Sequence, residues 1–303
     1  MTVIDVTGLT KCYGQKTVVD DVALRIEPGE IMGFLGPNGS GKTTTIRMIC
    51  GLLTPDAGRG TVLGRDLTRE ARAIRRDVGY MTQRFSFYED LSIQENLEFV
   101  ARLYGLRPVR DHVFKTLTDL NLYHRRRDLA GTLSGGWKQR LALAACVMHE
   151  PKLLLLDEPT AGVDPEARRE FWDHIHALSA SGITVLVSTH YMDEAERCNR
   201  ISYILRGRLL VTGTATALIE ECGLHAFKLL GDGIDVAFGE LEGQGSVEQV
   251  TVLGNTLHIV GSDLPSLRTA VMPVADRHGL RVESADPSLE DVFVHLVQST
   301  ART

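Results

Sequence analysis

The sequence predicts an α/β protein with a mainly parallel sheet, an inserted helical subdomain and a small C-terminal α+β extension. Three observations support this prediction. Strand-like apolar runs alternate with helical spacing in the first two thirds of the chain, residues 85–150 have helical spacing with few β-branched runs, and the pattern changes around Gly213. We therefore expect a first domain at residues 1–215, with its helical subdomain at about 85–150, and an accessory domain at residues 216–303.

The first domain begins with strand-like segments that lead into a helix. Residues 2–35 alternate β-like runs with turns, and the last run, Ile31–Leu35, is short, apolar and bounded by glycines. Such a run is typical of a buried strand. The spacing over Thr43–Leu53 predicts a helix that Thr54-Pro55 ends.

Helical segments and then further strands follow. Ile93–Tyr104 and Val113–Leu120 have the apolar spacing of helices and belong to the inserted subdomain. Strand-like runs resume at Leu153–Leu156 and Ile183–Ser188, separated by a helical stretch from Pro165 to Ser179. Two continuous apolar strands joined by a helix indicate a parallel sheet covered on both faces.

The C-terminal part has a different pattern. Ala215–Cys222 predicts a helix that ends at Gly223, and short strands and a helix are expected up to residue 303. Five glycines are interpreted as turn positions there, namely Gly231, Gly233, Gly239, Gly243 and Gly245.

Composition excludes fibrous, disordered and membrane-spanning classes. Apolar residues make up 43% of the chain and charged residues 24%, as in ordinary globular proteins. The longest apolar run, Leu141–Met148, is far shorter than the ~18 residues of a membrane span. The N-terminus carries Asp5 and lacks the pattern of a signal peptide. We expect a cytosolic chain.

Cysteine spacing and charge narrow the possible classes of protein further. No two of the five cysteines have the spacing of a zinc or redox motif, so we interpret them as small hydrophobic residues in a reducing compartment. The net charge is −6, and residues 224–303 hold the excess with 11 acidic and 5 basic side chains. The run Arg125–Arg127 is interpreted as a solvated helix end. Without a basic face, no nucleic-acid partner is expected.

A glycine-rich loop after the Ile31–Leu35 strand predicts a phosphate-binding site. It fits the pattern G-x-x-x-x-G-K-[ST] with Gly36, Pro37, Asn38, Gly39, Ser40, Gly41, Lys42 and Thr43. Glycines let consecutive backbone N–H groups turn inward around an anion, and the following helix N-terminus adds partial positive charge. Lys42 suits the β- and γ-phosphates, and the Thr43 hydroxyl suits Mg²⁺. The core is therefore expected to be a P-loop nucleoside triphosphatase.

Two adjacent carboxylates complete this hypothesis. Asp157 and Glu158 follow the apolar run Leu153–Leu156, at the carboxyl end of a strand where α/β sheets bind ligands. Asp157 suits the metal, and Glu158 suits the polarisation of an attacking water. Taken alone, two acids after a strand could also be a solvated loop. Together with the phosphate loop they indicate a magnesium-dependent site.

A second glycine turn precedes the helical run Trp137–Val147. Leu133-Ser134-Gly135-Gly136 places a further potential anion site at a helix N-terminus. The chain has no second lysine-bearing phosphate loop to pair with it. A second phosphate-binding turn without its own lysine makes physical sense if it binds the phosphate of a nucleotide held by another subunit.

These motifs resemble the ATP-binding cassette (ABC) ATPases over roughly residues 3–215, because the phosphate loop, the Asp157-Glu158 strand and the LSGG sequence occur in the family's order. Four further positions agree with the family. Tyr13 matches the aromatic that stacks on adenine, and Gln83 matches the glutamine that senses Mg²⁺ and water. Asp164 belongs to a D-loop-like segment that crosses the dimer interface, and His190 matches the switch histidine at the γ-phosphate.

The resemblance implies ATP and Mg²⁺ as cofactors and assigns the site residues. The catalytic residues would be Glu158, His190 and Gln83, and the metal ligands Thr43, Gln83 and Asp157. Contacts to ATP would come from Tyr13, Gly36, Pro37, Asn38, Gly39, Ser40, Gly41, Lys42, Thr43, Thr44, Ser134, Gly135, Gly136 and Asp164.

Some of these positions also allow ordinary structural roles. Tyr13 could be a buried aromatic, Gln83 a surface amide and His190 a structural histidine. Asp164 precedes Pro165 and is expected to act as a helix N-cap as well. Trp137 departs from the commonest family pattern, which has Gln after the two glycines, and receives no phosphate role.

Two segments resemble the bacterial drug- and polysaccharide-export branch of the family, namely Thr189–Glu196 and Asp286–Phe293. The resemblance implies a separate membrane-embedded permease and a second cassette, identical or paralogous, with which this chain would dimerise. It also implies a position on the cytoplasmic face of the inner membrane, held through the permease.

The competing class is a soluble ABC ATPase that acts on ribosomes or DNA. Translation-factor members usually carry two cassettes, whereas this chain has one. DNA-repair members carry very long coiled-coil insertions, whereas 49 residues separate Gln83 from Leu133. We therefore favour the exporter hypothesis.

Overall fold

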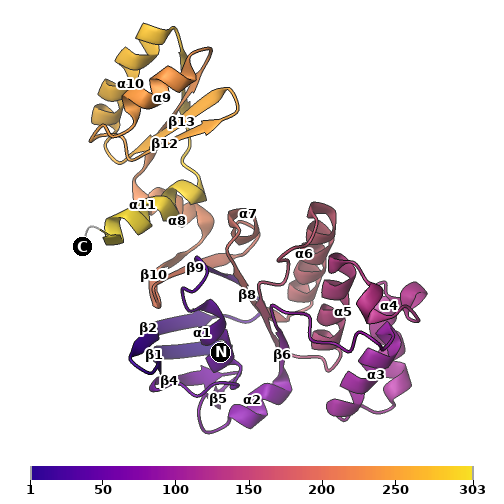
Figure 1. The fold of residues 1–303 in the computed structure, drawn as a ribbon. Helices are drawn as coiled ribbons and strands as arrows, with labels where there is room; N and C mark the ends of the chain where they lie inside the picture. The colour runs from indigo at the N-terminus through magenta and orange to yellow at the C-terminus, as the bar shows by residue number, and fades with distance from the viewer. Residues whose placement is uncertain (1, 302–303) are drawn as a thin grey trace. The chain divides into compact units, whose positions relative to one another are not determined.

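The computed structural model describes residues 2–301, which divide into two compact units between Thr212 and Gly213. The first unit contains two sheets with helices around them, and the second contains one sheet with four helices among the described residues (Figure 1). In residues 2–301, no helix combines the length and the apolar character that crossing a membrane requires.

A six-stranded sheet forms the centre of the first unit. Its spatial order is β10-β9-β3-β8-β7-β6, and the β9-β3, β3-β8, β8-β7 and β7-β6 pairs are parallel. The strands are β3 (Ile31–Leu35), β6 (Val78–Met81), β7 (Leu153–Asp157), β8 (Thr184–Thr189), β9 (Arg200–Leu205) and β10 (Arg208–Gly213). The predicted parallel pairing of the strands on either side of the Pro165 helix is confirmed. Every residue of β3, β7 and β8 is buried, which explains their continuous apolar character.

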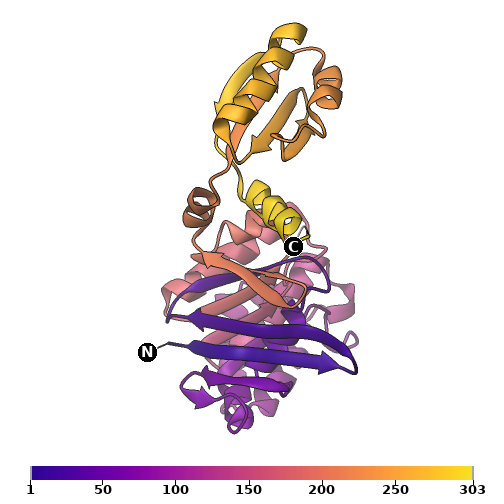
Figure 2. The ribbon, with the colours of Figure 1, turned by 90° about the vertical axis from the view of Figure 1, so that its left-hand side faces the viewer.

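The first unit also contains a four-stranded antiparallel sheet. The sequence analysis did not distinguish this sheet from the parallel one. Its spatial order is β2-β1-β4-β5, with β1 (Ile4–Tyr13), β2 (Lys16–Ile26), β4 (Ala57–Val62) and β5 (Arg65–Asp66). These strands lie side by side in Figure 2. Helix α1 (Lys42–Ile49) packs between the two sheets, with Ile46 and Ile49 fully buried in the core that both sheets share.

Helix α1 is shorter than the sequence predicts. It ends at Ile49 rather than Leu53, because Gly51 adopts a φ of +71° and turns the chain. A Cβ atom on Gly51 would lie 2.8 Å from the carbonyl oxygen of Ala71, the first residue of α2 (Ala71–Asp77). The helix therefore stops at a glycine before the proline is reached.

The inserted helices lie on one side of the parallel sheet (Figure 1). They are α3 (Ile93–Leu103), α4 (Val109–Asp119), the 3₁₀ turns η1 (Tyr123–Arg125) and η2 (Ala130–Thr132), and α5 (Gly135–Val147). Ser92 and Glu95 form a reciprocal cap at the start of α3. Two predicted helices begin earlier than expected, at Val109 instead of Val113 and at Gly135 instead of Trp137. Helices α6 (Pro165–Ala180) and α7 (Met192–Ala195) complete the unit.

The second unit is a four-stranded antiparallel sheet with helices. The strand order is β12-β13-β11-β14. Its elements are α8 (Ala215–Cys222), β11 (His225–Leu230), α9 (Ile234–Leu241), β12 (Gln249–Leu253), β13 (Thr256–Gly261), α10 (Leu264–His278), β14 (Arg281–Ala285) and α11 (Leu289–Ala301). Gly223 ends α8 with a φ of +63°, as predicted. The turn predicted at Gly239 is wrong, because this residue lies inside α9.

The Asp286–Phe293 segment anchors α11 to this sheet. The Asp291 carboxylate accepts hydrogen bonds from the Ser288 amide (2.7 Å) and hydroxyl (2.8 Å), and lies 3.0 Å from His258 Nε2 of β13. Gln249 of β12 donates to the Asp291 carbonyl. Burial alone would raise the pKa of the Asp291 carboxyl, but the hydrogen bonds from His258 and Ser288 outweigh it and lower the pKa.

Three of the five cysteines are buried, as the sequence analysis expects of small apolar side chains, and Cys12 and Cys222 are half-buried. None of the five is in a disulfide bond. Cys50, Cys146 and Cys198 are buried, and burial raises the thiol pKa to about 11 for Cys50 and about 12 for the other two. Thiols with such pKa values are poor nucleophiles at neutral pH.

Candidate active site

The phosphate loop connects β3 to α1 and is built for close backbone approach. Gly41 has a φ of 108°, which L side chains rarely adopt, and a Cβ atom on it would lie 2.7 Å from the Val18 carbonyl oxygen. A Cβ atom on Gly36 would lie 2.2 Å from the Ile204 carbonyl oxygen. Only glycine fits at these two positions, which keeps the loop in its curled form.

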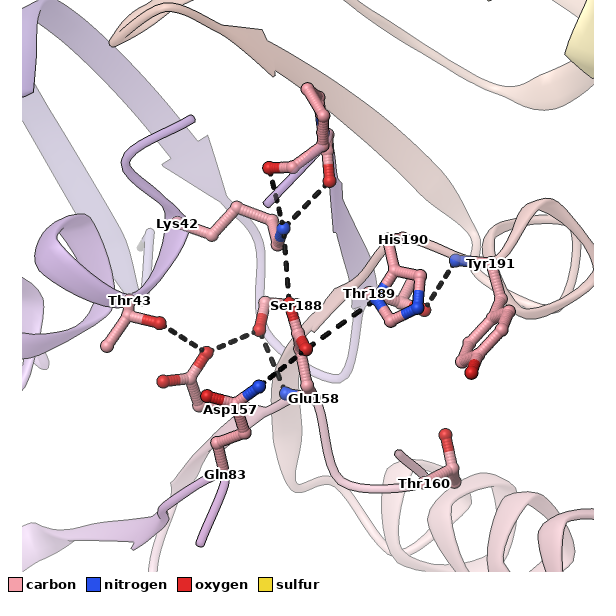
Figure 3. Close-up of polar contacts among 12 residues, drawn as sticks. Lys42, Thr43, Gln83, Asp157, Glu158, Thr160, Ser188, Thr189, His190 and Tyr191 are labelled. Carbon is pink, nitrogen blue, oxygen red and sulfur yellow. Dashed lines mark hydrogen bonds and ion pairs between the residues drawn. The ribbon is translucent and has the colours of Figure 1, made fainter. Parts of the chain in front are cut away.

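Lys42 begins α1 and its ammonium group lies inside this loop. Nζ donates to the carbonyl oxygens of Gly36 (2.7 Å) and Pro37 (3.1 Å), as Figure 3 shows. The side chain is only 4% exposed. A cavity of about 300 Å³ lies at the loop. Its lining consists of Val18, Asn38, Gly39, Gly41, Lys42, Thr43, Thr44, Gln83 and Glu158.

Asp157 ends β7 beside the loop and accepts two hydroxyl hydrogen bonds on one oxygen. Thr43 Oγ1 donates to Asp157 Oδ1 at 3.1 Å, and Ser188 Oγ donates to the same atom at 2.7 Å (Figure 3). Because β7 and β8 are parallel neighbours that pair Asp157 with Ser188, the sheet register itself creates the second contact. The sequence analysis did not identify Ser188, since a serine inside an apolar strand gives no distinctive pattern.

Glu158 is the carboxylate that the other polar groups of the site surround. Lys42 Nζ lies 3.2 Å from Oε1, Gln83 Nε2 donates to Oε2 at 2.8 Å, and His190 Nδ1 lies 3.6 Å from Oε2. The Glu158 side chain is 8% exposed. Thus the structure brings together the predicted catalytic residues Glu158, Gln83 and His190 (Figure 3).

The backbone of Glu158 is held in an unusual conformation. Its φ is +48°, in the left-handed region that non-glycine residues seldom occupy. Its amide donates to the carbonyl oxygen (3.1 Å) and the hydroxyl (3.0 Å) of Ser188. These contacts with β8 hold the carboxylate at the edge of the phosphate cavity, where it could orient a water against a bound phosphate.

The donor set fits Mg²⁺ chemistry. Thr43 Oγ1 and Asp157 Oδ1 lie within one hydrogen bond of each other beside the phosphate loop, and both are oxygens. Mg²⁺ sites commonly combine one carboxylate with a hydroxyl, phosphate oxygens and waters. Gln83 also lines the cavity, with its amide nitrogen on Glu158.

The Ser134–Gly136 turn lies at a different cavity. Ser134 is the N-cap residue of α5, with an exposed side chain, and Gly135 and Gly136 begin the helix. Ser134 and Gly136 line a cavity of about 190 Å³ between α5 and α6 that shares no lining residue with the phosphate-loop cavity in the described part of the chain. A Cβ atom on Gly136 would lie 2.5 Å from that of Ala167, so α5 and α6 touch there with no room for a methyl group.

Asp164 and Trp137 also lie at this second cavity. The expected N-cap role of Asp164 is confirmed, because its carboxylate accepts from the Ala167 amide at the start of α6. Trp137 is contacted by two guanidinium groups, Arg125 and Arg140, each 4.7 Å from the ring centroid. Arg125 also pairs with Asp128, so the predicted solvated helix end packs partly on an aromatic ring.

Tyr13 is exposed at the end of a strand. It is the last residue of β1, its side chain is 52% exposed, and it does not line the phosphate-loop cavity in residues 2–301. An exposed ring at the end of a strand is available for stacking, in contrast to the alternative of a buried aromatic.

Comparisons with known proteins agree on one family. The family model described as "ABC transporter" matches residues 19–161. The chain is 46% identical over 215 residues to the probable multidrug ABC transporter ATP-binding protein YbhF of Escherichia coli strain K12. The match covers 70% of this chain and 37% of that protein, so the chain spans well under half of that relative's length. It is 37% identical to the Nod factor export ATP-binding protein I of Rhizobium sp. strain N33, over 97% of this chain and 96% of that protein.

Solved structures show the same fold. The structure of an ATP-binding subunit of an ABC transporter matches with a TM-score of 0.66 and 30% identity, over 73% of this chain and 94% of that one. A dimeric ATP-binding cassette in a post-hydrolysis state, bound to ADP and Pi, matches with a TM-score of 0.64 and 27% identity, over 70% of this chain and 98% of that one.

Proposed function

The chain belongs to the ATP-binding cassette transporter family, and from this premise we propose that it is the ATP-hydrolysing subunit of an exporter whose membrane-embedded part is a separate protein. The observation that carries the proposal is the placement of Glu158 at the phosphate cavity, in contact with Lys42, Gln83 and His190. The similarity to drug-export and Nod-factor-export proteins supports the direction of transport.

In the proposed reaction each side chain has a distinct task. Lys42 and the backbone N–H groups of residues 38–44 hold the β- and γ-phosphates, and Tyr13 stacks on the adenine. Glu158 accepts a proton from the water that attacks the γ-phosphorus, while the bond from that phosphorus to the oxygen bridging it to the β-phosphate breaks and ADP leaves. His190 stabilises the charge that develops on the γ-phosphate. Gln83 orients the water together with Glu158, to which it is hydrogen-bonded.

Thr43, Asp157 and Gln83 are the residues proposed to hold Mg²⁺. When bound, the cation neutralises phosphate charge and so favours attack on the γ-phosphate. Ser188 fixes the Asp157 carboxylate through a 2.7 Å hydrogen bond, which presents a preset oxygen to the metal.

Closure between two copies is proposed to complete the site. One chain supplies one lysine-bearing phosphate loop and one separate glycine turn, at cavities that share no lining residue among residues 2–301. Ser134–Gly136 of one cassette would bind the γ-phosphate held by Lys42 of the other, with Asp164 at the interface. ATP shifts the open-to-closed equilibrium only through its higher affinity for the closed dimer.

The proposed partners follow from the same scheme. A polytopic permease takes up the closing motion near Gln83, and the chain is held by it at the cytoplasmic face of the inner membrane. No nucleic-acid partner is proposed, because the charged residues form no basic excess in either part of the chain.

Reconstitution tests this proposal. The chain is purified together with a polytopic membrane protein, where a neighbouring gene encodes one, and placed in lipid vesicles. ATP hydrolysis and ATP-dependent substrate movement are then measured with wild type and Glu158→Gln. We expect both activities in wild type and neither in the variant. Hydrolysis that responds to ribosomes or DNA but not to the membrane protein would favour the soluble class instead.

A further inference from the structure

A buried carboxylate outside the phosphate cavity connects the two segments that carry Glu158 and His190. Glu194 lies in α7, four residues after His190, and is 1% exposed. Thr160 Oγ1 donates a hydrogen bond to its Oε1, and Thr189 Oγ1 donates to its Oε2 at 2.6 Å. Burying a carboxylate costs several kcal/mol unless hydrogen bonds and a countercharge offset it, so this position requires an explanation.

The groups that contact Glu194 come from three elements. Thr160 follows Glu158 by two residues in the loop that leads to α6, and Thr189 is the last residue of β8. Arg168 of α6 supplies the countercharge, with Nε 3.6 Å from Glu194 Oε1. One carboxylate therefore binds the Glu158–Asp164 loop, the end of the strand before His190, and the helix after the loop.

These contacts extend to His190 itself. The Thr189 hydroxyl, which donates to Glu194, also accepts a hydrogen bond from the Tyr191 amide at 3.0 Å (Figure 3). The Tyr191 ring has two partners: the Arg168 guanidinium is 4.4 Å from its centroid, and the His190 ring centroid is 4.1 Å away. Thr189 and Tyr191 flank His190. Thr189 is hydrogen-bonded to Glu194, and Tyr191 contacts both Thr189 and the Arg168 guanidinium that pairs with Glu194.

His190 has little else among the described residues to set its orientation. Its Nδ1 is buried without a hydrogen-bond partner, and its distance to Glu158 Oε2, 3.6 Å, is too long for a hydrogen bond. The imidazole is therefore positioned by its backbone and by Tyr191 rather than by a bond of its own.

We propose that Glu194 is a positioning residue for hydrolysis: it holds the His190 segment and the Thr160 loop in one fixed arrangement, so that His190 and Glu158 face the same phosphate. The proposal rests on the roles given above to His190 and Glu158. Glu194 does not line the phosphate cavity, so its effect is on turnover and not on ATP binding. Misplacing a catalytic group by about 1 Å can cost on the order of 10²-fold in rate.

A double-mutant cycle between Glu194→Gln and His190→Ala tests the proposal. The amide keeps the volume of the carboxylate but removes the negative charge that pairs with Arg168. It also turns one acceptor into a donor, so that one threonine hydroxyl must accept instead of donate. We expect kcat to fall roughly tenfold to 100-fold in Glu194→Gln, with unchanged affinity for a non-hydrolysable ATP analogue. In the His190→Ala background the same substitution should lower kcat by clearly less than it does in the wild type, because the part of its effect that acts through His190 is already lost.

Asp193→Asn is the matched control. Asp193 is the neighbouring carboxylate, also near Arg168 (3.7 Å), but it is exposed. Its substitution should leave kcat within about twofold of wild type. Thr160→Val, which removes one donor to Glu194 at constant shape, replaces Glu194→Gln in the cycle if that variant does not fold.

Each outcome decides the proposal. Additive effects of Glu194→Gln and His190→Ala, or a loss of ATP affinity that parallels the loss of kcat, would overturn the proposal, because Glu194 would then not act on turnover through His190. If His190→Ala hydrolyses ATP at the wild-type rate, the catalytic role of His190 fails, and the positioning role of Glu194 falls with it.

Discussion

We expect replacement of Glu158 by glutamine to separate ATP binding from ATP hydrolysis in this protein. Glutamine has nearly the same shape and accepts the same backbone conformation, but it cannot take up a proton at neutral pH. Its carbonyl can remain toward Lys42, whose Nζ is 3.2 Å from Oε1, and its NH₂ then faces the Gln83 amide. A flip of the Gln83 amide offers an acceptor to that NH₂, so the hydrogen-bond network can close again.

The size of the effect follows from what is removed. Loss of a positioned general base typically lowers turnover by about 10²–10⁴-fold, equivalent to roughly 2.7–5.5 kcal/mol of transition-state free energy. Binding is expected to be retained, because Lys42 keeps its contacts with the Gly36 and Pro37 carbonyls and the loop geometry does not depend on the charge at residue 158. The variant should therefore accumulate as an ATP-bound dimer.

The assay combines steady-state phosphate release with size-exclusion chromatography in Mg²⁺-ATP. Glu150→Gln is the matched control, since it makes the same chemical change at an exposed carboxylate outside the site. Turnover near the wild-type rate in Glu158→Gln would remove Glu158 from the catalytic role. Turnover lost together with ATP affinity would show that the residue supports the loop and not the chemistry.

Further predictions concern the ammonium group, the glycine turn and the C-terminal unit. Lys42→Ala should weaken binding of an ATP analogue by about 2–5 kcal/mol in an equilibrium titration, because a buried charge contact to phosphate is lost, and unchanged affinity would place the phosphates elsewhere. Chains with Ser134→Arg and chains with Lys42→Ala should each be nearly inactive as homodimers, whereas mixing should restore up to half of the wild-type activity per mixed dimer if the two sites act independently. Loss of hydrolysis by Ser134→Arg in a demonstrated monomer would contradict action across the dimer. The pKa of Asp291 is lowered in the folded state, so its contribution to the free energy of unfolding is present above the unfolded-state pKa of ~3.9 and is lost as pH falls through the folded-state pKa. Asp291→Asn should therefore flatten the acid side of the unfolding profile of residues 213–301, and an unchanged profile would contradict this assignment.

The sequence predicts the parts of the site that are local along the chain. The phosphate loop, Asp157 and Glu158 each lie next to an apolar strand, and their chemistry is contained in a few consecutive residues. The neighbouring position of His190 was also predictable, because two apolar strands joined by a helix form a parallel pair.

The remaining features depend on contacts between distant segments. Ser188 binds Asp157 only because the register of β7 and β8 places these two residues side by side. A serine within an apolar strand gives no sequence pattern that predicts such a contact. From the sequence alone, Glu194 would be assigned to the surface of a short acidic helix. In the structure it is buried, and Thr160 and Thr189 donate hydrogen bonds to its carboxylate. Local rules also failed for Gly239, which lies within α9, because packing of the helix outweighs the small helix preference of glycine.

The left-handed backbone of Glu158 implies a trade-off between the stability of the fold and ATPase activity. A non-glycine residue at a φ of +48° costs on the order of 1–2 kcal/mol, and the charge of its side chain is largely removed from water. Folding alone would not select this residue at this position. Selection of variants for thermal stability without a transport assay should therefore enrich changes at residue 158, and the most heat-resistant of them would be inactive.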